Sequence, residues 1–136
     1  MAQRDLDLAR QSVTTAEAQL ADARARLTTA EKQLGDAVIP LRLDVTDPAS
    51  CESFVNGANE ALGGIDILIN AAGLSLGRDP FTESNEEDEH TVLETNVNGL
   101  LRMTRLCLPY IRDGGHIVNL GSVAGRQAYP NGAVYV

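Results

Sequence analysis

The sequence predicts an α/β fold in which a partial, doubly wound parallel sheet with three recognisable strands follows a long N-terminal helix. From Val38 onward, short apolar runs alternate with longer segments of helical composition. Glycine pairs and an Asp-Pro step separate these segments, as expected for turns and helix ends. The resulting order of strand, helix, strand, helix, strand favours parallel strands joined by right-handed crossovers. A chain of 136 residues is long enough for one such domain with a core.

A single long helix is predicted over residues 5–34. No Gly or Pro occurs before Gly35, and the segment is rich in residues that favour helix, such as Ala, Leu, Arg, Gln and Glu. An apolar residue recurs at every seventh position, a spacing that forms a seam for a neighbouring helix. The seam consists of Leu6, Val13, Leu20, Leu27 and Leu34. Residues 1–35 are therefore assigned to an amphipathic helix, and residues 36–136 to the α/β domain.

Two buried strands and the helix between them are predicted next. Residues 37–43 are mostly apolar, include β-branched side chains and carry one charge, which indicates a buried strand. Asp followed by Pro at 47–48 predicts the start of a helix over about 48–62, which a pair of glycines ends. The run I-D-I-L-I at 65–69 indicates a second buried strand.

A second long helix, over about 86–112, and a third strand, over 116–120, complete the pattern. Ser84 and Glu87 have the spacing of a capping box at the start of this helix, and Asn85 is an equally good cap. A second pair of glycines is expected to end the helix. Most of its apolar residues are expected to face the sheet. They are Leu93, Val97, Leu100 and Leu101.

The composition argues against several classes of partner. The net charge is −8 and the cations are scattered, whereas surfaces that bind nucleic acid or anionic membranes need clustered Lys and Arg. No apolar run is long enough to span a membrane. Cys51 and Cys107 lack the spacing of a metal site and are expected to be reduced, buried thiols. We therefore expect a cytoplasmic protein without a metal site.

Polar residues follow each predicted strand, at the edge where parallel sheets bind ligands. Asp44 follows the first strand, N-A-A-G at 70–73 ends the second, and Gly121 and Ser122 follow the third. Each also has a simpler interpretation, because Asp, Asn, Gly and Ser are common in turns and loops. Asn96 is a poor helix former inside the second long helix. It is either solvated or marks a kink that exposes backbone to a water in an active site.

Ser122 and Tyr135 form a pair that can polarise a carbonyl. A serine hydroxyl can donate a hydrogen bond to a substrate oxygen, and a tyrosine phenol can pass that oxygen a proton. Because a phenol has a pKa of about 10, it needs a nearby cation to act at neutral pH. That cation is expected one helical turn after Tyr135, beyond the last residue of this sequence.

Taken together, five segments resemble the short-chain dehydrogenase/reductase family. They are D-V at 44–45, N-A-A-G at 70–73, N-V-N-G at 96–99, G-S-V-A-G at 121–125 and Tyr135. The resemblance covers about residues 22–136 and implies a Rossmann-like sheet. The segments at 73–80 and 103–109 look closest to the branch that oxidises 3-hydroxy acids and serine with NADP.

The resemblance implies contacts with NADP or NAD. Asp44 would hydrogen-bond the adenine amino group, with the backbone of Val45 beside it. The four residues that follow the second strand would pack their backbone against the adenine ribose. They are Asn70, Ala71, Ala72 and Gly73.

The resemblance also implies three catalytic residues. Asn96 would hold a water in a proton relay, and Ser122 would orient the substrate carbonyl. Tyr135 would act as general acid or base, while the hydride would come from the nicotinamide.

Some features of the family are missing from the chain. The family's first strand and its G-x-x-x-G-x-G turn, which seat the pyrophosphate on a helix N-terminus, should precede residue 22. The second strand and the lysine after the Tyr are also missing, and residues 1–21 resemble nothing in the family. Without two central strands, the remaining ones either pair with each other or leave open edges. We interpret the chain as a fragment, with doubtful cofactor binding and no activity expected as given.

Two functions follow from these observations. The first is an NAD(P)-dependent oxidoreductase that interconverts a hydroxyl and a carbonyl on a small substrate. The alternative is a non-catalytic fragment or fusion whose heptad helix mediates helix–helix interaction. The resemblance also implies a homo-oligomer that forms through the helix at 86–112.

Overall fold

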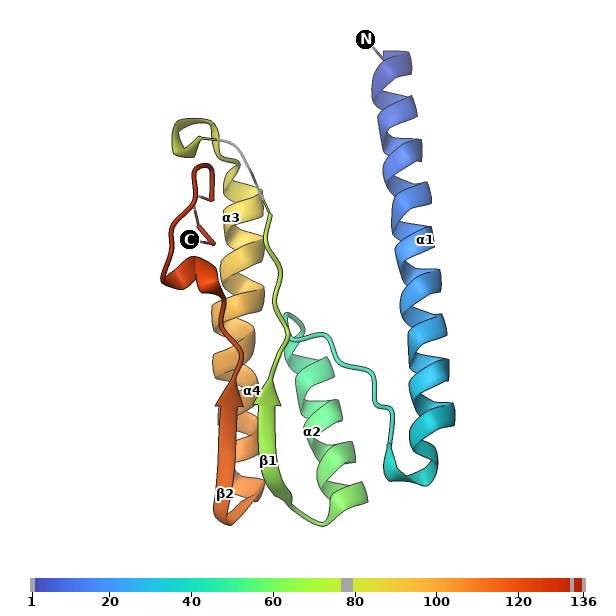
Figure 1. Cartoon of the computed structure of the whole chain (residues 1–136), viewed down its shortest axis with the longest axis vertical. Helices are drawn as coiled ribbons and strands as arrows, with labels where there is room; N and C mark the ends of the chain where they lie inside the picture. Colours follow the sequence, from blue (N-terminus) through green and yellow to red (C-terminus); the bar gives the residue numbers. More distant parts are fainter. Residues whose placement is uncertain (1, 77–79, 133, 136) are drawn as a thin grey trace. The chain divides into compact units, whose positions relative to one another are not determined.

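The computed structural model describes residues 2–76, 80–132 and 134–135. The chain divides into two compact units, residues 1–40 and residues 41–136. The first unit contains α1, Ala2–Leu34, and a 3-10 turn, Gly35–Ala37 (Figure 1). Gly35 has a φ of 54°, a left-handed conformation that glycine adopts without strain at the end of a helix. In the described residues, no helix is long and apolar enough to cross a membrane.

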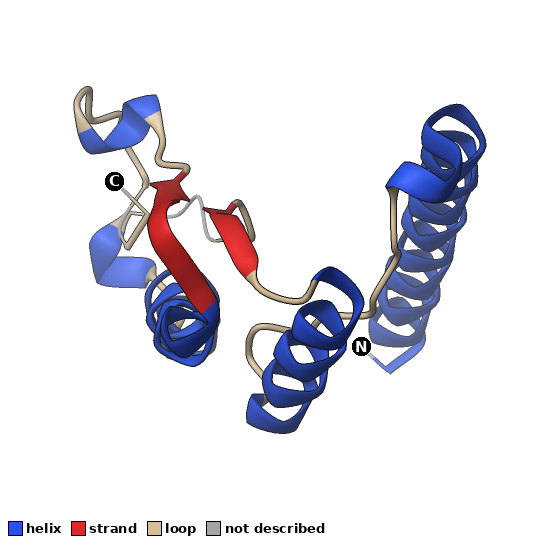
Figure 2. Ribbon diagram, turned by 90° about the horizontal axis from the view of Figure 1, so that it is seen from below, coloured by secondary structure: helices blue, strands red, loops and turns tan. Residues whose placement is uncertain are grey.

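The second unit is a small parallel sheet with helices packed on one side. The strands are β1 (Ile65–Asn70) and β2 (Ile111–Asn119). The helical segments are α2 (Pro48–Leu62), α3 (Glu86–Leu93), a π-helix (Glu94–Gly99) and α4 (Leu100–Cys107), with 3-10 turns at Phe81–Glu83, Leu108–Tyr110 and Val123–Gly125. Both α2 and α4 lie on the same side of the two strands (Figure 2). The predicted α/β class is confirmed, and α2 and β1 form where the sequence predicts them.

The prediction of a strand at 37–43 is wrong. Residues 38–44 are irregular, and in the described part of the chain the sheet consists of β1 and β2 alone. Ile39 and Leu41 are 50% and 39% exposed. A strand is stable only when its backbone groups pair with a neighbour, and no described strand lies beside this segment. The sheet therefore has two strands where the sequence predicts three.

The second strand of the sheet begins earlier than predicted, at Ile111 instead of His116. The pairing of β1 with β2 is irregular between Ile65 and Ile67, and the extra residues of β2 form a bulge there. Gly114 has a φ of 82°, and a Cβ on Gly115 would lie 2.6 Å from Ile111 Cγ2. The glycine pair that was expected to end the preceding helix therefore shapes a bulge inside β2.

The face of the α3–α4 segment that packs inward is not the one predicted. Its buried residues are Val92, Thr95, Gly99, Met103 and Cys107. Leu93, Val97 and Leu101 are 47%, 47% and 51% exposed, so the expectation that they form a sheet-facing core is wrong, whereas Leu100 is partly buried. The buried residues and the exposed leucines and valine each recur at helical spacing, on different sides of the segment. On the buried side, Gly99 lies against Val45.

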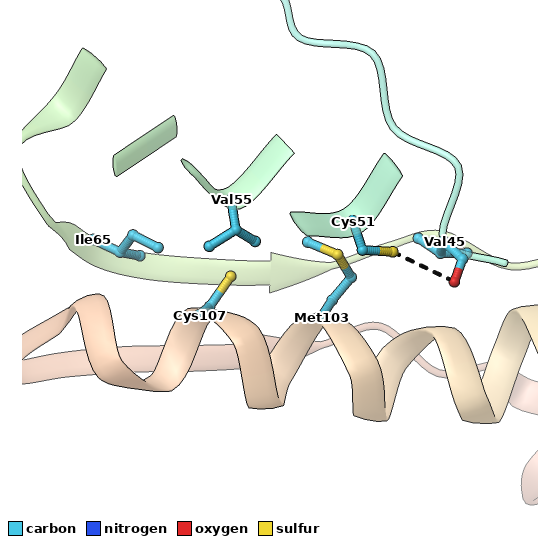
Figure 3. Close-up of a cluster of buried hydrophobic side chains, with 6 residues drawn as sticks. All are labelled: Val45, Cys51, Val55, Ile65, Met103 and Cys107. Carbon is cyan, nitrogen blue, oxygen red and sulfur yellow. Dashed lines mark hydrogen bonds between the residues drawn. The ribbon is translucent and has the colours of Figure 1, made fainter. Parts of the chain in front are cut away.

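The core lies between α2, β1 and α4. It consists of Val45, Cys51, Val55, Ile65, Met103 and Cys107 (Figure 3). Both cysteines are free and buried, as predicted, and burial raises the pKa of each thiol. The opposite face of the sheet is open: Ile67 and Ile69 are 56% and 59% exposed, so β1 is not the fully buried strand that its apolar run predicts.

Side chains cap the N-terminal ends of α2 and α3. Asp47 accepts a hydrogen bond from the Ala49 amide at 3.0 Å, and Pro48 occupies the first helical position of α2. Asn85 accepts one from the Glu87 amide at 2.9 Å at the start of α3. Asn85 is therefore the cap, of the two alternatives that the sequence left open.

Candidate active site

A cavity of about 420 Å³ opens at the edge where β1 and β2 end. Residues 71–73 follow β1 and residues 120–122 follow β2, and both segments line it together with the π-helix. Asn96, Ser122 and Tyr135 all line this cavity. Among the described residues that line it, none is charged. The structure thus brings the three predicted catalytic residues to one uncharged hollow, at the edge where parallel sheets bind ligands.

Asn96 lies in the π-helix and is tied to the loop after β1. Its Oδ1 accepts a hydrogen bond from the Leu74 amide at 2.9 Å, and its Nδ2 donates one to the Leu74 carbonyl at 2.8 Å. Gly73 packs beside it, since a Cβ there would lie 3.4 Å from Asn96 Oδ1. The solvated interpretation of Asn96 is therefore wrong. A π-helical turn at this position fits the alternative of an irregular helix, which is frequent at functional sites.

Ser122 and Tyr135 approach the cavity from the segment after β2. Ser122 is the N-cap of a 3-10 turn, where its Oγ accepts a hydrogen bond from the Ala124 amide at 3.1 Å. Because the hydroxyl is the acceptor in this bond, its proton remains available for a substrate oxygen. Tyr135 is partly buried, and its amide donates to the Gly132 carbonyl at 2.8 Å. Both side chains are thus placed by local turns.

Most of the predicted cofactor residues surround a second, more apolar cavity of about 320 Å³. Val45, Asn70, Ala71 and Ala72 line it, and the two alanines also line the first cavity. Gly73 lines only the first of the two, and Asp44 lines neither. The two hollows therefore share a wall of small side chains, which permits close approach by a ligand from either side.

Asn70 has a structural task that its motif did not reveal. It is 9% exposed, and its Nδ2 donates to Asn119 Oδ1 at 2.8 Å and to Thr104 Oγ1 at 3.1 Å. Its carbonyl accepts a hydrogen bond from the Leu120 amide at 2.9 Å. Asn70 thus ties the end of β1 to the end of β2 and to α4. Thr104 and Asn119 gave no signal in the sequence, because each looks like an ordinary polar residue of a helix or strand.

Asp44 is exposed and is held by its own turn. Its Oδ1 accepts hydrogen bonds from the Thr46 amide at 3.0 Å and the Thr46 hydroxyl at 2.7 Å, and its amide bonds Ser50 Oγ at 2.9 Å. The Thr46 hydroxyl is the main reason that the pKa of Asp44 lies below its ordinary value, and the Thr46 amide adds to it. This is also the turn that the simpler interpretation of Asp44 predicts.

Replacing Thr46 with valine is expected to raise the pKa of Asp44, because it removes the hydroxyl bond and keeps the amide bond. A depressed carboxyl pKa contributes stability above the unfolded value, which is lost as the pH falls through the folded value. The variant should therefore lose this contribution at a higher pH than the wild type. An NMR titration of the Asp44 carboxyl carbon measures the shift, with Thr91→Val as a control that leaves Asp44 untouched. An unchanged Asp44 titration in the Thr46 variant would contradict this assignment.

Comparison with known proteins identifies the family. Residues 6–136 match the model of the short chain dehydrogenase family. The chain belongs to that family. The matched range also takes in residues 6–21, which were predicted to lie outside the resemblance.

Relatives of known name support the same placement. The chain is 44% identical over 101 residues to an NADP-dependent 3-hydroxy acid dehydrogenase of Schizosaccharomyces pombe. The aligned residues cover 73% of this chain and 39% of the relative. It is 41% identical over 100 residues to an enzyme of the same name from Salmonella typhimurium, covering 72% of this chain and 40% of that one. The resemblance to the 3-hydroxy acid branch of the short-chain dehydrogenases is thus confirmed. The chain spans about two fifths of the length of these relatives.

Solved structures show the same fold. A serine dehydrogenase from Escherichia coli superposes with a TM-score of 0.73 at 41% identity, over 82% of this chain and 52% of that one. The closed form of serine dehydrogenase complexed with NADP+ gives a TM-score of 0.74 at 41% identity, over 82% and 46% of the two chains. The Rossmann-like arrangement of the short-chain dehydrogenases is therefore present in the part that this chain spans.

Proposed function

We propose that the chain supplies the substrate-facing side of an NADP-dependent oxidoreductase site that interconverts a hydroxyl and a carbonyl on a small hydroxy acid. The observation that carries this proposal is the convergence of Asn96, Ser122 and Tyr135 on one cavity from distant parts of the sequence. Family membership supports the reaction class. The names of the relatives support NADP as cofactor and a 3-hydroxy acid as substrate.

The proposed chemistry divides between Ser122 and Tyr135. The Ser122 hydroxyl donates a hydrogen bond to the carbonyl oxygen and fixes its direction. The Tyr135 phenol gives that oxygen a proton in reduction and takes it back in oxidation. Asn96 holds the Gly73–Leu74 backbone in place through its two hydrogen bonds and so shapes the wall of the cavity. Bound NADP supplies or accepts the hydride.

The residues between the two cavities suit the adenosine part of such a cofactor. Ala71 and Ala72 are small enough for a ribose to approach their backbone, and both are exposed. Thr46 occupies Oδ1 of Asp44, which leaves Oδ2 to accept a hydrogen bond from an adenine amino group. Val45, Asn70 and Gly73 complete the proposed set of cofactor contacts.

A turnover assay on the 136-residue chain tests the proposal, and it is run at alkaline pH because no charged residue lines the described cavity to help the phenol act at neutral pH. NADP+ with 3-hydroxypropionate, the simplest 3-hydroxy acid, should form NADPH, and Ser122→Ala should slow this reaction. NAD+ should be a poorer substrate than NADP+ at equal concentration. Absence of turnover with either cofactor would contradict the proposal and favour the inactivity expected from the sequence.

The alternative function rests on a separate observation in α1. Val13, Leu20 and Leu27, which are spaced by seven, are 57%, 52% and 48% exposed. An exposed heptad seam supports association with another helix. Sedimentation of the full chain and of its Leu20→Glu variant tests this: the variant should have the lower mass, and a monomeric wild type would exclude the role.

Association through the α3–α4 segment is the oligomer that the family resemblance implies. Leu93, Val97 and Leu101 form an exposed stripe, but Leu93 and Val97 also line the cavity of Ser122 and Tyr135, so Leu101 is the residue of the stripe that supports this proposal. Leu101→Glu changes this stripe without touching the cavity of Ser122 and Tyr135. In sedimentation it should lower the mass of the wild-type assembly, and an unchanged mass would contradict this interface.

A further inference from the structure

The guanidinium of Arg102 joins two segments that are distant in the sequence. Its Nη1 donates a hydrogen bond to the carbonyl of Val45, which lies 57 residues earlier, and its Nη2 pairs with Glu94 Oε1 at 2.7 Å. The side chains of Arg102 and Glu94 are each only 22% exposed. One side chain of α4 thus reaches both the π-helix and the turn that carries Asp44.

Glu94 is oriented from both sides. Arg102 binds its Oε1, and Asn98 Nδ2 donates to its Oε2 at 2.6 Å. The hydrogen bond from Arg102 is the main reason that the pKa of Glu94 lies below its ordinary value, and the bond from Asn98 is the second. Glu94 is therefore a charged, fixed anchor for the guanidinium at neutral pH.

The π-helix explains why Glu94 and Arg102 can meet. In a regular α-helix, residues eight apart exceed two full turns by almost one residue, or about 80° around the axis. A π-helical turn takes up an extra residue. The π-helix Glu94–Gly99 therefore returns the two side chains toward one side of the helix.

The same helix also fixes the side chain of Val45. Val45 is 8% exposed, and a Cβ on Gly99 would lie 2.8 Å from Val45 Cγ2 and 3.3 Å from its carbonyl oxygen. The close approach needs a glycine at this position. The helix therefore holds Val45 by contact at Gly99 and by a charge-assisted hydrogen bond from Arg102.

We propose that Arg102 is a positioning residue: anchored by Glu94, it holds the Val45 carbonyl and thereby sets the Asp44–Val45 turn against the cofactor's adenine. This inference rests on the proposed function, because the adenine contact belongs to it. The link also connects the adenine end of the site to the helix that carries Asn96. A movement of the Asp44–Val45 turn is therefore resisted by the helix that carries Asn96.

The test compares Arg102→Met with Arg102→Lys and with Arg105→Met, an exposed arginine on the same helix. The first readout is hydrogen exchange at the amides of Thr46 and Asp47, which close the turn. Arg102→Met should speed this exchange by about tenfold, since a charge-assisted bond is lost locally. Arg102→Lys keeps a cationic donor and should restore part of the protection, whereas Arg105→Met should match the wild type.

The second readout separates the two ends of the cofactor. In Arg102→Met, adenosine 2′,5′-bisphosphate should bind about tenfold more weakly, while reduced nicotinamide mononucleotide should keep its wild-type Kd. Equal weakening of both ligands, or unchanged exchange at Thr46 and Asp47, would overturn the positioning role. If the wild type binds neither ligand, the proposed function fails, and the exchange data then decide whether Arg102 holds the turn.

Discussion

Replacing Tyr135 with phenylalanine is expected to slow NADPH-dependent carbonyl reduction by about 100- to 10,000-fold, the contribution of a positioned acid or base. Tyr135 lines the cavity, and the substitution removes only its phenol oxygen and keeps the ring. Binding of the substrate should change little, because the Ser122 hydroxyl still donates to the carbonyl. The measurement is a steady-state assay in which the loss falls on kcat and spares KM.

The chain offers a matched control for the Tyr135 variant. Tyr129 is 45% exposed and does not line the cavity, so Tyr129→Phe should keep the wild-type rate. A Tyr135→Phe variant that retains the wild-type rate would show that another group moves the proton. Equal losses in both variants would point to a general effect of removing a phenol on the structure.

Replacing Met103 with alanine is expected to lower the free energy of unfolding by about 2–5 kcal/mol, as for other buried large-to-small changes. Met103 is 3% exposed and stands at the centre of the cluster between α2 and α4 (Figure 3). It also lines the apolar cavity beside β1, so the core is already loosely filled on that side. Urea denaturation followed by circular dichroism measures the loss.

Met103→Leu is the control for this prediction. It conserves volume and should cost less than about 1.5 kcal/mol. If Met103→Ala had the same denaturation midpoint as the wild type, the cluster would not carry the stability of the second unit. The assignment of the core to α2, β1 and α4 would then be wrong.

Residues that end or begin a helix were enough to predict α2 from the sequence. The Asp47–Pro48 step and the glycines after α2 specify helix ends through backbone geometry, which is the same in any fold. The order of polar segments also sufficed to predict that residues 71–73 and 121–122 meet, because parallel strands bring their carboxyl ends to one edge. The family resemblance, and not the strand order, placed Asn96 and Tyr135 at the same site, and both line the cavity.

The failures concern features that depend on neighbours. Residues 38–44 have the composition of a buried strand, but composition cannot supply the neighbouring strand that a ladder needs. Ile67 is apolar and yet exposed for the same reason, since nothing described covers that face of the sheet. Leu93 and Leu101 were assigned to the core because they are apolar, whereas the buried side of the segment includes Thr95 and Gly99, whose residue types give no core signal.

If the cavity at the ends of β1 and β2 is the oxidoreductase site, NADP+ must perturb the residues that line it. A titration of the ¹⁵N-labelled chain with NADP+, followed by amide NMR shifts, reports this perturbation for each residue. We expect saturable shifts at residues 71–73 and at Gly121 and Ser122, which line the cavity, with residues 10–30 unaffected. Saturable shifts that avoid the cavity, or no shifts at millimolar cofactor, would contradict it.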